Sequence, residues 1–187
     1  MDRIKWVSVV SVDNALQNII DLNFIGSTIA SGKKLGAKVV KKSCPDEKVG
    51  TICRINNIDC IIEYFELPNA IAELTDLENN LVYSYGVTLN YLFDVTYLLQ
   101  NNLIKSMPLH LVTKKADVLK SANGTNDLIS RECYKFESLI IDQVSLLKDV
   151  YFYEVDREYE FAPIKNRVGK DSLESAQKML KNRGINY

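Results

Sequence analysis

Short β-branched runs alternate along this chain with segments whose apolar residues follow helical spacing. The strand-like runs cover Trp6–Val12, Ala37–Lys42, Val49–Ile55, Ile58–Phe65, Leu81–Gly86, His110–Thr113 and Val150–Val155. Such runs, bounded by turn residues, are typical of β-strands. The pair Asn56-Asn57 separates two of them and indicates a hairpin. We expect Trp6–Val12 to be a buried strand.

Helix-like segments complete the alternation. They cover Ala15–Leu22, Ile25–Ser31, Pro68–Leu77, Leu89–Asn101, Tyr134–Leu147 and Ser172–Lys181. Asp171 or Ser172 is the expected cap of the last helix, and Ala122–Asp127 is expected to form a turn. The alternation predicts an α/β domain with a mixed β-sheet flanked by helices. No repeat, linker or low-complexity tract divides the 187 residues, so we expect a single domain.

The composition argues against several classes of protein. Apolar residues make up 47% and the net charge is −1, which gives no basic excess for nucleic acid or for a membrane surface. The four cysteines form no CxxC pair, and His110 is far from them in sequence, which argues against zinc. Without a signal peptide or a run of membrane-spanning length, we expect a cytoplasmic protein with reduced thiols.

Asp13 stands in the triplet VDN, directly after the first strand-like run. The carboxyl ends of central strands are where α/β sheets bind ligands. A carboxylate at this position is suited to hold Mg²⁺ against a phosphate. The alternative is that Asp13 caps the segment that follows it. The local sequence leaves both interpretations open.

The segment Glu160–Asp171, EFAPIKNRVGKD, follows the last strand-like run. Pro163 stiffens the turn, so Lys165 can present a fixed ammonium to a phosphate, with Arg167 and Lys170 close in sequence. The alternative is a solvated charged loop, because most charged side chains lie at the surface.

Two further groups carry possible binding chemistry. Glu63-Tyr64 combines a carboxylate for sugar hydroxyl groups with an aromatic wall, although it is also an ordinary end of a strand. His110 near Lys114-Lys115 could bind phosphate, although a surface cluster is the simpler interpretation. No Walker-type glycine loop is present among the 187 residues.

The order of these blocks is more specific than any one of them. VDN is followed by FIGSTIASGKKLGAKVVKK, VGTICRINNIDCIIEYFEL, HLVTKK, YKFESLIID and YFYEVDREYEFAPIKNRVGKDSLESAQKML. This series resembles the eukaryotic-type UDP-N-acetylglucosamine pyrophosphorylases and their UDP-sugar pyrophosphorylase relatives, the UDPGP family. The resemblance covers nearly the whole chain, and its most specific part is EFAPIKN.

The resemblance implies a fold and a reaction. The fold is part of a Rossmann-like nucleotide-diphospho-sugar transferase domain. The reaction converts UTP and N-acetylglucosamine 1-phosphate to UDP-N-acetylglucosamine and pyrophosphate, with Mg²⁺ or Mn²⁺ as the metal. The sugar phosphate attacks the α-phosphorus of UTP in line, and the protein positions the reactants and neutralises charge. UTP or the UDP-sugar and the sugar 1-phosphate are therefore the expected partners.

The resemblance also implies site residues. Asp13 of VDN would bind the metal, and Lys165 would be the catalytic residue that contacts the phosphates. Gly50 would let the backbone approach the ligand, and Glu63 and Tyr64 would lie at the sugar. Asn90, with Gly86, matches the family's FNAGNIANHFF block, so we expect it to bind substrate.

Some positions depart from the family pattern. Val87 stands where the family has an asparagine that contacts the N-acetyl sugar, and a valine side chain forms no hydrogen bond. Leu139 and Ile141 replace aromatic residues that help to wall the sugar pocket. These departures leave open UDP-glucose or a broader range of UDP-sugars, and also a degenerate module that binds a nucleotide-sugar or a partner without catalysis.

The family's glycine-rich GG-x-GTRLG loop and its C-terminal β domain have no counterpart in these 187 residues. We therefore expect residues 1–187 to form a single, incomplete catalytic domain that does not turn over substrate in isolation. The missing N-terminal half is the expected protein partner.

Overall fold

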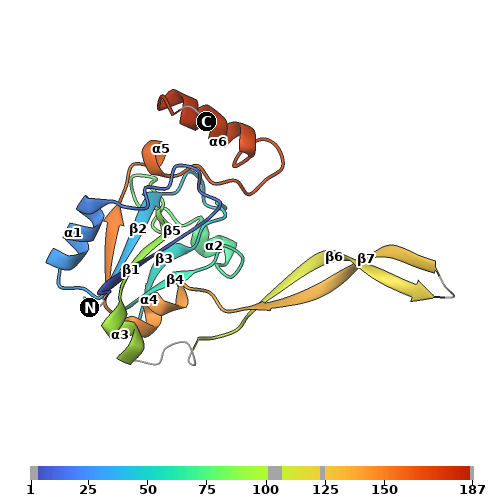
Figure 1. Cartoon of the computed structure of the whole chain (residues 1–187), viewed down its shortest axis with the longest axis horizontal. Helices are drawn as coiled ribbons and strands as arrows, with labels where there is room; N and C mark the ends of the chain where they lie inside the picture. Colours follow the sequence, from blue (N-terminus) through green and yellow to red (C-terminus); the bar gives the residue numbers. More distant parts are fainter. Residues whose placement is uncertain (1–3, 101–106, 123–124, 186–187) are drawn as a thin grey trace.

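The computed structural model describes residues 4–100, 107–122 and 125–185. Its centre is a six-stranded sheet with the order β4-β3-β5-β2-β8, in which β1 also pairs with β5 (Figure 1). The strands are β1 Trp6–Val10, β2 Leu35–Lys41, β3 Thr51–Ile55, β4 Ile58–Ile62, β5 Tyr85–Asp94 and β8 Val150–Glu154. β2 and β8 are parallel, whereas the other pairs are antiparallel. The expected mixed sheet of an α/β domain is therefore confirmed.

Six helices accompany the sheet in the described part of the chain. They are α1 Leu22–Ala30, α2 Asn69–Ala72, α3 Val95–Gln100, α4 Asp142–Leu147, α5 Arg157–Glu160 and α6 Leu173–Asn182. The main core joins β2 and β5 to α4, with Leu35, Tyr91, Phe93 and Val144 almost completely buried. Among the described residues, no helix has the length and apolar character needed to cross a membrane.

A second sheet consists of one long hairpin. β6 (His110–Ala122) pairs antiparallel with β7 (Thr125–Glu137), and Figure 1 shows the two strands projecting away from the central sheet. The sequence predicted a strand only at His110–Thr113 and a helix over Tyr134–Leu147. The helical prediction is wrong up to Ile141, because Tyr134–Glu137 belongs to β7 and the helix begins at Asp142. The predicted turn falls partly on residues 123–124, which lie outside the described residues.

The predicted helix Leu89–Asn101 is wrong for its first six residues. β5 continues to Asp94, and α3 begins at Val95. Leu92 and Phe93 are both buried, because β5 lies within the sheet and packs on both faces. A strand buried on both sides has no polar alternation, so its apolar residues imitate helical spacing.

The first predicted strand forms, but not as a buried one. In the described residues β1 pairs with β5 and with no other strand, and Val7 is 39% exposed. Val12 lies beyond the end of β1 and is fully exposed. β1 therefore lies at an edge of the sheet.

Three other predicted elements are shorter or shifted. Ala15–Leu22 contains turns in place of a helix, and α1 begins at Leu22 because Asp21 accepts hydrogen bonds from the amides of Asn23 and Phe24. The helix expected over Pro68–Leu77 ends at Ala72. The strand expected over Leu81–Gly86 begins only at Tyr85.

The local signals with a clear mechanism are confirmed. Asn56 and Asn57 both have positive φ, at 50° and 62°, as the two-residue hairpin between β3 and β4 requires. Ser172 caps α6 in a capping box with Ser175.

Candidate functional site

A small cavity lies where the residues after β1 meet the turn after β4. It measures about 120 Å³ and is lined by five of the six predicted site residues: Asp13, Gly50, Glu63, Tyr64 and Lys165. Larger surface hollows of about 410 to 790 Å³ lie elsewhere in the described part of the chain, and none of the six predicted residues lines them. The smaller cavity is therefore the candidate site, named the Asp13–Lys165 pocket below.

The Asp13–Lys165 pocket combines charged groups with an apolar wall. Its charged side chains are those of Asp13, Lys48, Glu63 and Lys165. Its apolar wall comes from Val49, Val87, Leu89, Ile141 and Phe161. Two carboxylates and two ammonium groups beside an apolar surface can bind a ligand that carries phosphate and hydroxyl groups together with an apolar face.

Hydrogen bonds hold Asp13 beside the segment that carries Lys165. The amide of Ile164 donates to the carbonyl oxygen of Asp13 at 2.9 Å. The hydroxyl of Ser11 donates to Asp13 Oδ1. The two sequence motifs VDN and EFAPIKN, which are distant in the sequence, are thus neighbours in space.

Asn14 makes this neighbourhood rigid, and the sequence assigned it no function. It is 5% exposed, its Nδ2 donates to the carbonyl oxygen of Glu160 at 2.8 Å, and its Oδ1 accepts from the amide of Ala162 at 2.8 Å. The amide of Ala15 donates to the carbonyl oxygen of Ala162 at 3.0 Å. The third residue of the VDN triplet is therefore a structural connector between the two motifs.

Lys165 leaves the turn with its side chain directed to the loop before β3. Its Nζ donates to the carbonyl oxygen of Lys48 at 2.7 Å. The amides of Lys165 and Asn166 both donate to the carbonyl oxygen of Asp171, at 2.7 and 2.8 Å, which closes the loop. A carbonyl oxygen is a weaker partner for an ammonium group than a phosphate is, so the Lys165 ammonium can turn to an anionic ligand.

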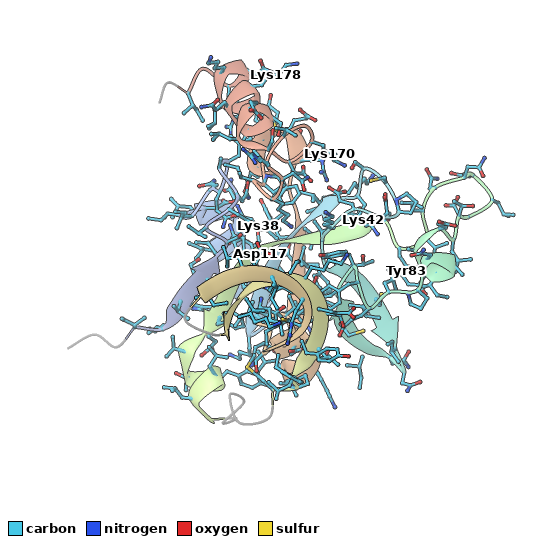
Figure 2. The ribbon with its side chains drawn as sticks, turned by 90° about the vertical axis from the view of Figure 1, so that its right-hand side faces the viewer. Lys38, Lys42, Tyr83, Asp117, Lys170 and Lys178 are labelled. Carbon is cyan, nitrogen blue, oxygen red and sulfur yellow. The ribbon has the colours of Figure 1, made fainter. Side chains whose placement is uncertain are left out.

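Lys170 lies in the same loop but outside the pocket lining. Its Nζ donates to Ser43 Oγ at 2.8 Å, and Figure 2 shows it on the side of the molecule where Lys42 lies. The structure therefore separates the two lysines that the sequence placed close together.

Glu63 is the half-buried carboxylate of the pocket. Burial raises its pKa, and the neighbouring Glu66 acts in the same direction, whereas Lys165 opposes both. The net pKa of Glu63 lies above its ordinary value. Tyr64 follows it and is 43% exposed, so its ring is open to a ligand.

Gly50 lies behind Glu63, where only glycine fits. A Cβ at this position would lie 2.7 Å from Ile61 Cγ2 and 3.2 Å from Val87 Cγ2. In this structure the backbone at Gly50 thus lies close to side chains of the neighbouring strands β4 and β5. Val87 and Ile141 both line the pocket, while Leu139 packs against the main core.

Asn90 is not brought to the pocket with the other five predicted residues. It is 2% exposed on β5, and its Nδ2 donates to the carbonyl oxygen of Asn18 at 3.3 Å. Its Oδ1 is buried without a hydrogen-bond partner in the described residues. Asn90 thus connects β5 to the loop before α1 in this structure.

A bulge in β5 contributes Leu89 to the apolar wall, and sequence reasoning missed this bulge. Between Ala37–Tyr91 and Val39–Val87 the register shifts, so three residues of β5 lie opposite Lys38 alone. In this bulge Leu89 has a φ of 55°, which is unusual for a branched side chain. Strained residues and bulges concentrate at functional sites, and Leu89 lines the pocket.

Lys38, labelled in Figure 2, lies in β2 and is one of the most deeply buried side chains of the described residues. Its side chain is 1% exposed, and its Nζ lies 2.6 Å from Asp21 Oδ2 and 2.5 Å from Glu160 Oε2. A buried ammonium between two carboxylates fixes β2, the start of α1 and the EFAPIKN segment together. The sequence signal was a lysine within the otherwise apolar block GAKVV.

The pocket's fit to a metal ion depends on Asp13. The described residues contain no group of three or more His, Cys, Asp or Glu side chains placed to hold a metal. A single carboxylate is nevertheless compatible with Mg²⁺, which keeps several waters and takes other oxygen ligands from substrate phosphates.

A family model described as UTP–glucose-1-phosphate uridylyltransferase, UDPGP, matches residues 3–181. The chain belongs to this family. Among curated UDPGP relatives, the UDP-N-acetylhexosamine pyrophosphorylase-like protein 1 of Xenopus tropicalis is 32% identical over 95% of this chain and 35% of its own length. The UDP-N-acetylglucosamine pyrophosphorylase of Saccharomyces cerevisiae is 35% identical over 89% of this chain and 36% of its own length. This UDPGP chain thus spans about a third of these relatives.

Solved structures show the same fold. The uridine diphosphate N-acetylglucosamine pyrophosphorylase of Trypanosoma brucei has a TM-score of 0.75 at 23% identity, over 95% of this UDPGP chain and 35% of that chain. A UDP-glucose pyrophosphorylase of Leishmania major has a TM-score of 0.61 at 18% identity, over 86% of this chain and 34% of that chain.

Proposed function

We propose that this chain is the metal-binding and sugar-binding part of a uridylyltransferase that makes UDP-N-acetylglucosamine and pyrophosphate from UTP and N-acetylglucosamine 1-phosphate. The observation that carries the proposal is the convergence of Asp13, Gly50, Glu63, Tyr64 and Lys165 on one pocket. These residues come from separate parts of the sequence. The chain spans about a third of the length of these curated relatives.

Each pocket residue supplies one element of the reaction. A phosphate oxygen of the sugar 1-phosphate attacks the α-phosphorus of UTP, and the bond to the β-phosphate breaks as pyrophosphate leaves. Lys165 neutralises negative charge on the phosphates, which is the main contribution a protein makes to phosphoryl transfer. Glu63 accepts hydrogen bonds from sugar hydroxyl groups, while the Tyr64 ring packs on the sugar.

Asp13 would hold the divalent metal, Mg²⁺ or Mn²⁺, together with substrate oxygens. When bound, the metal supplies positive charge that stabilises the transferring phosphoryl group. Asp13 is positioned for this by Ser11 and by its main-chain bond to Ile164. The Lys165 ammonium lines the same cavity, so metal and lysine would act on one phosphate cluster.

The likeness to curated relatives supports N-acetylglucosamine as the sugar. The relatives at 32% and 35% identity are named for UDP-N-acetylhexosamine and UDP-N-acetylglucosamine. Val87 cannot hydrogen-bond the N-acetyl group, so recognition would depend on the apolar wall and on Glu63.

Isothermal titration calorimetry with N-acetylglucosamine 1-phosphate, with and without MgCl₂, tests the proposal. We expect magnesium-enhanced binding to the wild-type chain and no magnesium enhancement in Asp13→Asn. Glucose 1-phosphate serves as the comparison ligand, and we expect it to bind more weakly. If the wild-type chain binds neither sugar phosphate at millimolar concentration, the proposed function is wrong.

A further inference from the structure

His110 lies between two carboxylates at the base of the long hairpin. Its Nδ1 lies 2.7 Å from Glu66 Oε1, and its Nε2 lies 3.0 Å from Asp142 Oδ2. The His110 side chain is 11% exposed and that of Asp142 is 12% exposed. The first residue of β6 is thus held to two other segments of the molecule.

Both of those segments carry walls of the Asp13–Lys165 pocket. Glu66 belongs to the turn after β4, in which the amides of Glu66 and Leu67 donate to the carbonyl oxygen of Glu63 at 2.9 and 3.0 Å. Asp142 directly follows Ile141, which lines the pocket. His110 therefore joins the turn that carries Glu63 and Tyr64 to Asp142, the neighbour of a residue of the apolar wall.

We propose that His110 is a positioning residue for sugar binding, whose imidazolium ties the Glu63–Glu66 turn to the start of α4. The proposal rests on the proposed function for its ligand, although the positioning itself can be measured without one. Neutral imidazole donates from one nitrogen only, whereas the cation donates from both. Two carboxylate partners therefore require the cation for both bonds to form.

The surrounding charges favour this cation. Burial by itself lowers the pKa of His110, but the hydrogen bonds to Glu66 and Asp142 outweigh it, and the net pKa is raised. Glu63 also interacts with His110 through charge, and this interaction lowers the pKa of Glu63. Across the hairpin, Glu137 pairs with His110 in register and forms an ion pair with Lys135.

The protonation state of His110 therefore determines whether the turn beside the pocket is anchored. With His110 charged, both of its hydrogen bonds form, and the turn that carries Glu63 and Tyr64 is anchored to the start of α4. When His110 loses its proton, one of its two bonds is lost and the turn is released from α4. Sugar binding should therefore weaken as the pH rises through the pKa of His110.

NMR tests the positioning directly, because His110 is the single histidine of the chain. The imidazole carbon–proton signal gives its pKa, and the Ile141 methyl and Tyr64 ring signals report the two walls. We expect all three to share one titration midpoint, above the ordinary histidine value. Glu66→Gln and Asp142→Asn should each lower that midpoint. If the Ile141 and Tyr64 signals do not follow His110, the proposal is wrong.

Calorimetry then connects the positioning to the ligand. Wild-type affinity for N-acetylglucosamine 1-phosphate should fall about tenfold between pH 6 and pH 8.5, as expected for loss of one charge-assisted hydrogen bond. His110→Gln should bind about tenfold more weakly at pH 6 and show only the titration of the ligand's own phosphate. Lys120→Gln, on the projecting part of the hairpin, is the control with wild-type behaviour.

Together, the NMR titration and the calorimetry show whether the positioning by His110 or the proposed ligand is wrong. A shared NMR midpoint without any sugar-phosphate binding supports His110 as the positioning residue and refutes the ligand. Binding with the same pH profile in the wild type and in His110→Gln supports the ligand and overturns the positioning by His110.

Discussion

The amide of Ile164 donates a hydrogen bond of 2.9 Å to the carbonyl oxygen of Asp13. This bond and the contacts of Asn14 make one structural unit of the segment after β1 and the segment after α5. The unit sets the separation between a carboxylate and an ammonium that line the same pocket. Its rigidity comes from main-chain groups and one buried side-chain amide, and neither of the two charged side chains takes part in these bonds.

Asn14→Ala should therefore destabilise the fold and weaken ligand binding together. The change removes the partner of the buried Ala162 amide and of the partly buried Glu160 carbonyl oxygen. We expect a loss of about 1–3 kcal/mol in the free energy of unfolding, measured by urea denaturation. Asn182→Ala, at an exposed position in α6, is the matched control and should change the stability little. Equal stability of the two variants would contradict the connecting function of Asn14.

Lys165→Gln should weaken the binding of sugar phosphate without changing the stability. Lys165 is exposed, and within the described residues its side chain forms one hydrogen bond, to the carbonyl oxygen of Lys48. We expect about a tenfold loss of affinity, because one charge-assisted hydrogen bond to the phosphate is removed. Lys170→Gln is a strict control in calorimetry, since it removes the same charge from the same loop but not from the pocket. Equal losses in both variants would indicate only a general electrostatic effect.

Acid should unfold the protein through Asp21 and Glu47. Burial raises the pKa of Asp21, but Lys38 and the amides of Phe24 and Asn23 outweigh it and hold the net pKa below its ordinary value. Glu47 behaves likewise, with burial outweighed mainly by Arg157. A depressed folded-state pKa contributes stability above the unfolded-state pKa, about 4. That stability is lost as the pH falls through the folded-state value.

Urea denaturation followed by circular dichroism at a series of pH values from 2.5 to 9 measures this loss of stability. Asp21→Asn and Glu47→Gln should each flatten the acid part of the curve. His110 has the opposite sign, because its raised pKa gives stability below about pH 6.5 that disappears as the pH rises through the folded-state value. His110→Gln should thus flatten the curve on the neutral side only. If both carboxylate variants lose stability at acid pH as the wild type does, Asp21 and Glu47 are not the source of the acid-dependent stability.

The long hairpin should be dispensable for folding of the body. β6 and β7 pair with each other in a sheet of their own, and Leu119 and Leu128 are 70% and 71% exposed on it. Replacing Val112–Lys135 by an Asn-Gly turn keeps the His110 contacts. We expect the thermal midpoint of the body to be retained within a few degrees and the amide NMR signals of β2 and β5 to be unchanged. Collapse of these signals would show that the hairpin supports the core.

The sequence predicted the pocket better than the elements that carry it. Asp13, Glu63 and Lys165 belong to short motifs whose order is specific, and the structure brings them together. The prediction of a helix at Leu89–Asn101 was wrong in its first half because β5 is buried on both faces. A strand buried in this way lacks the alternation of apolar and polar residues that would identify it. Sequence reasoning gave no function to Lys38, because its partners Asp21 and Glu160 are distant in sequence and become neighbours only on folding.

Two glycines should respond to alanine with opposite signs. In Gly50→Ala the new methyl group would lie 2.7 Å from Ile61 Cγ2, closer than real contacts allow, so the free energy of unfolding should fall by about 1–3 kcal/mol. Gly26 lies inside α1, and apart from its chain neighbours and the backbone of its own helix no atom lies within 4 Å of the place that an added methyl group would take. Gly26→Ala should therefore raise the stability by about 0.5–1 kcal/mol.

Urea denaturation of both variants distinguishes steric exclusion at Gly50 from a general effect of alanine. Adding Ile61→Leu to Gly50→Ala removes the γ2 methyl group that the new Cβ meets, so it should restore part of the lost stability. The pocket gives a second readout, because Val87 lies 3.2 Å from the same Cβ position and lines the cavity. Affinity for N-acetylglucosamine 1-phosphate should therefore recover with the stability. If the double variant is no more stable than Gly50→Ala, the contact with Ile61 is not what requires glycine at this position.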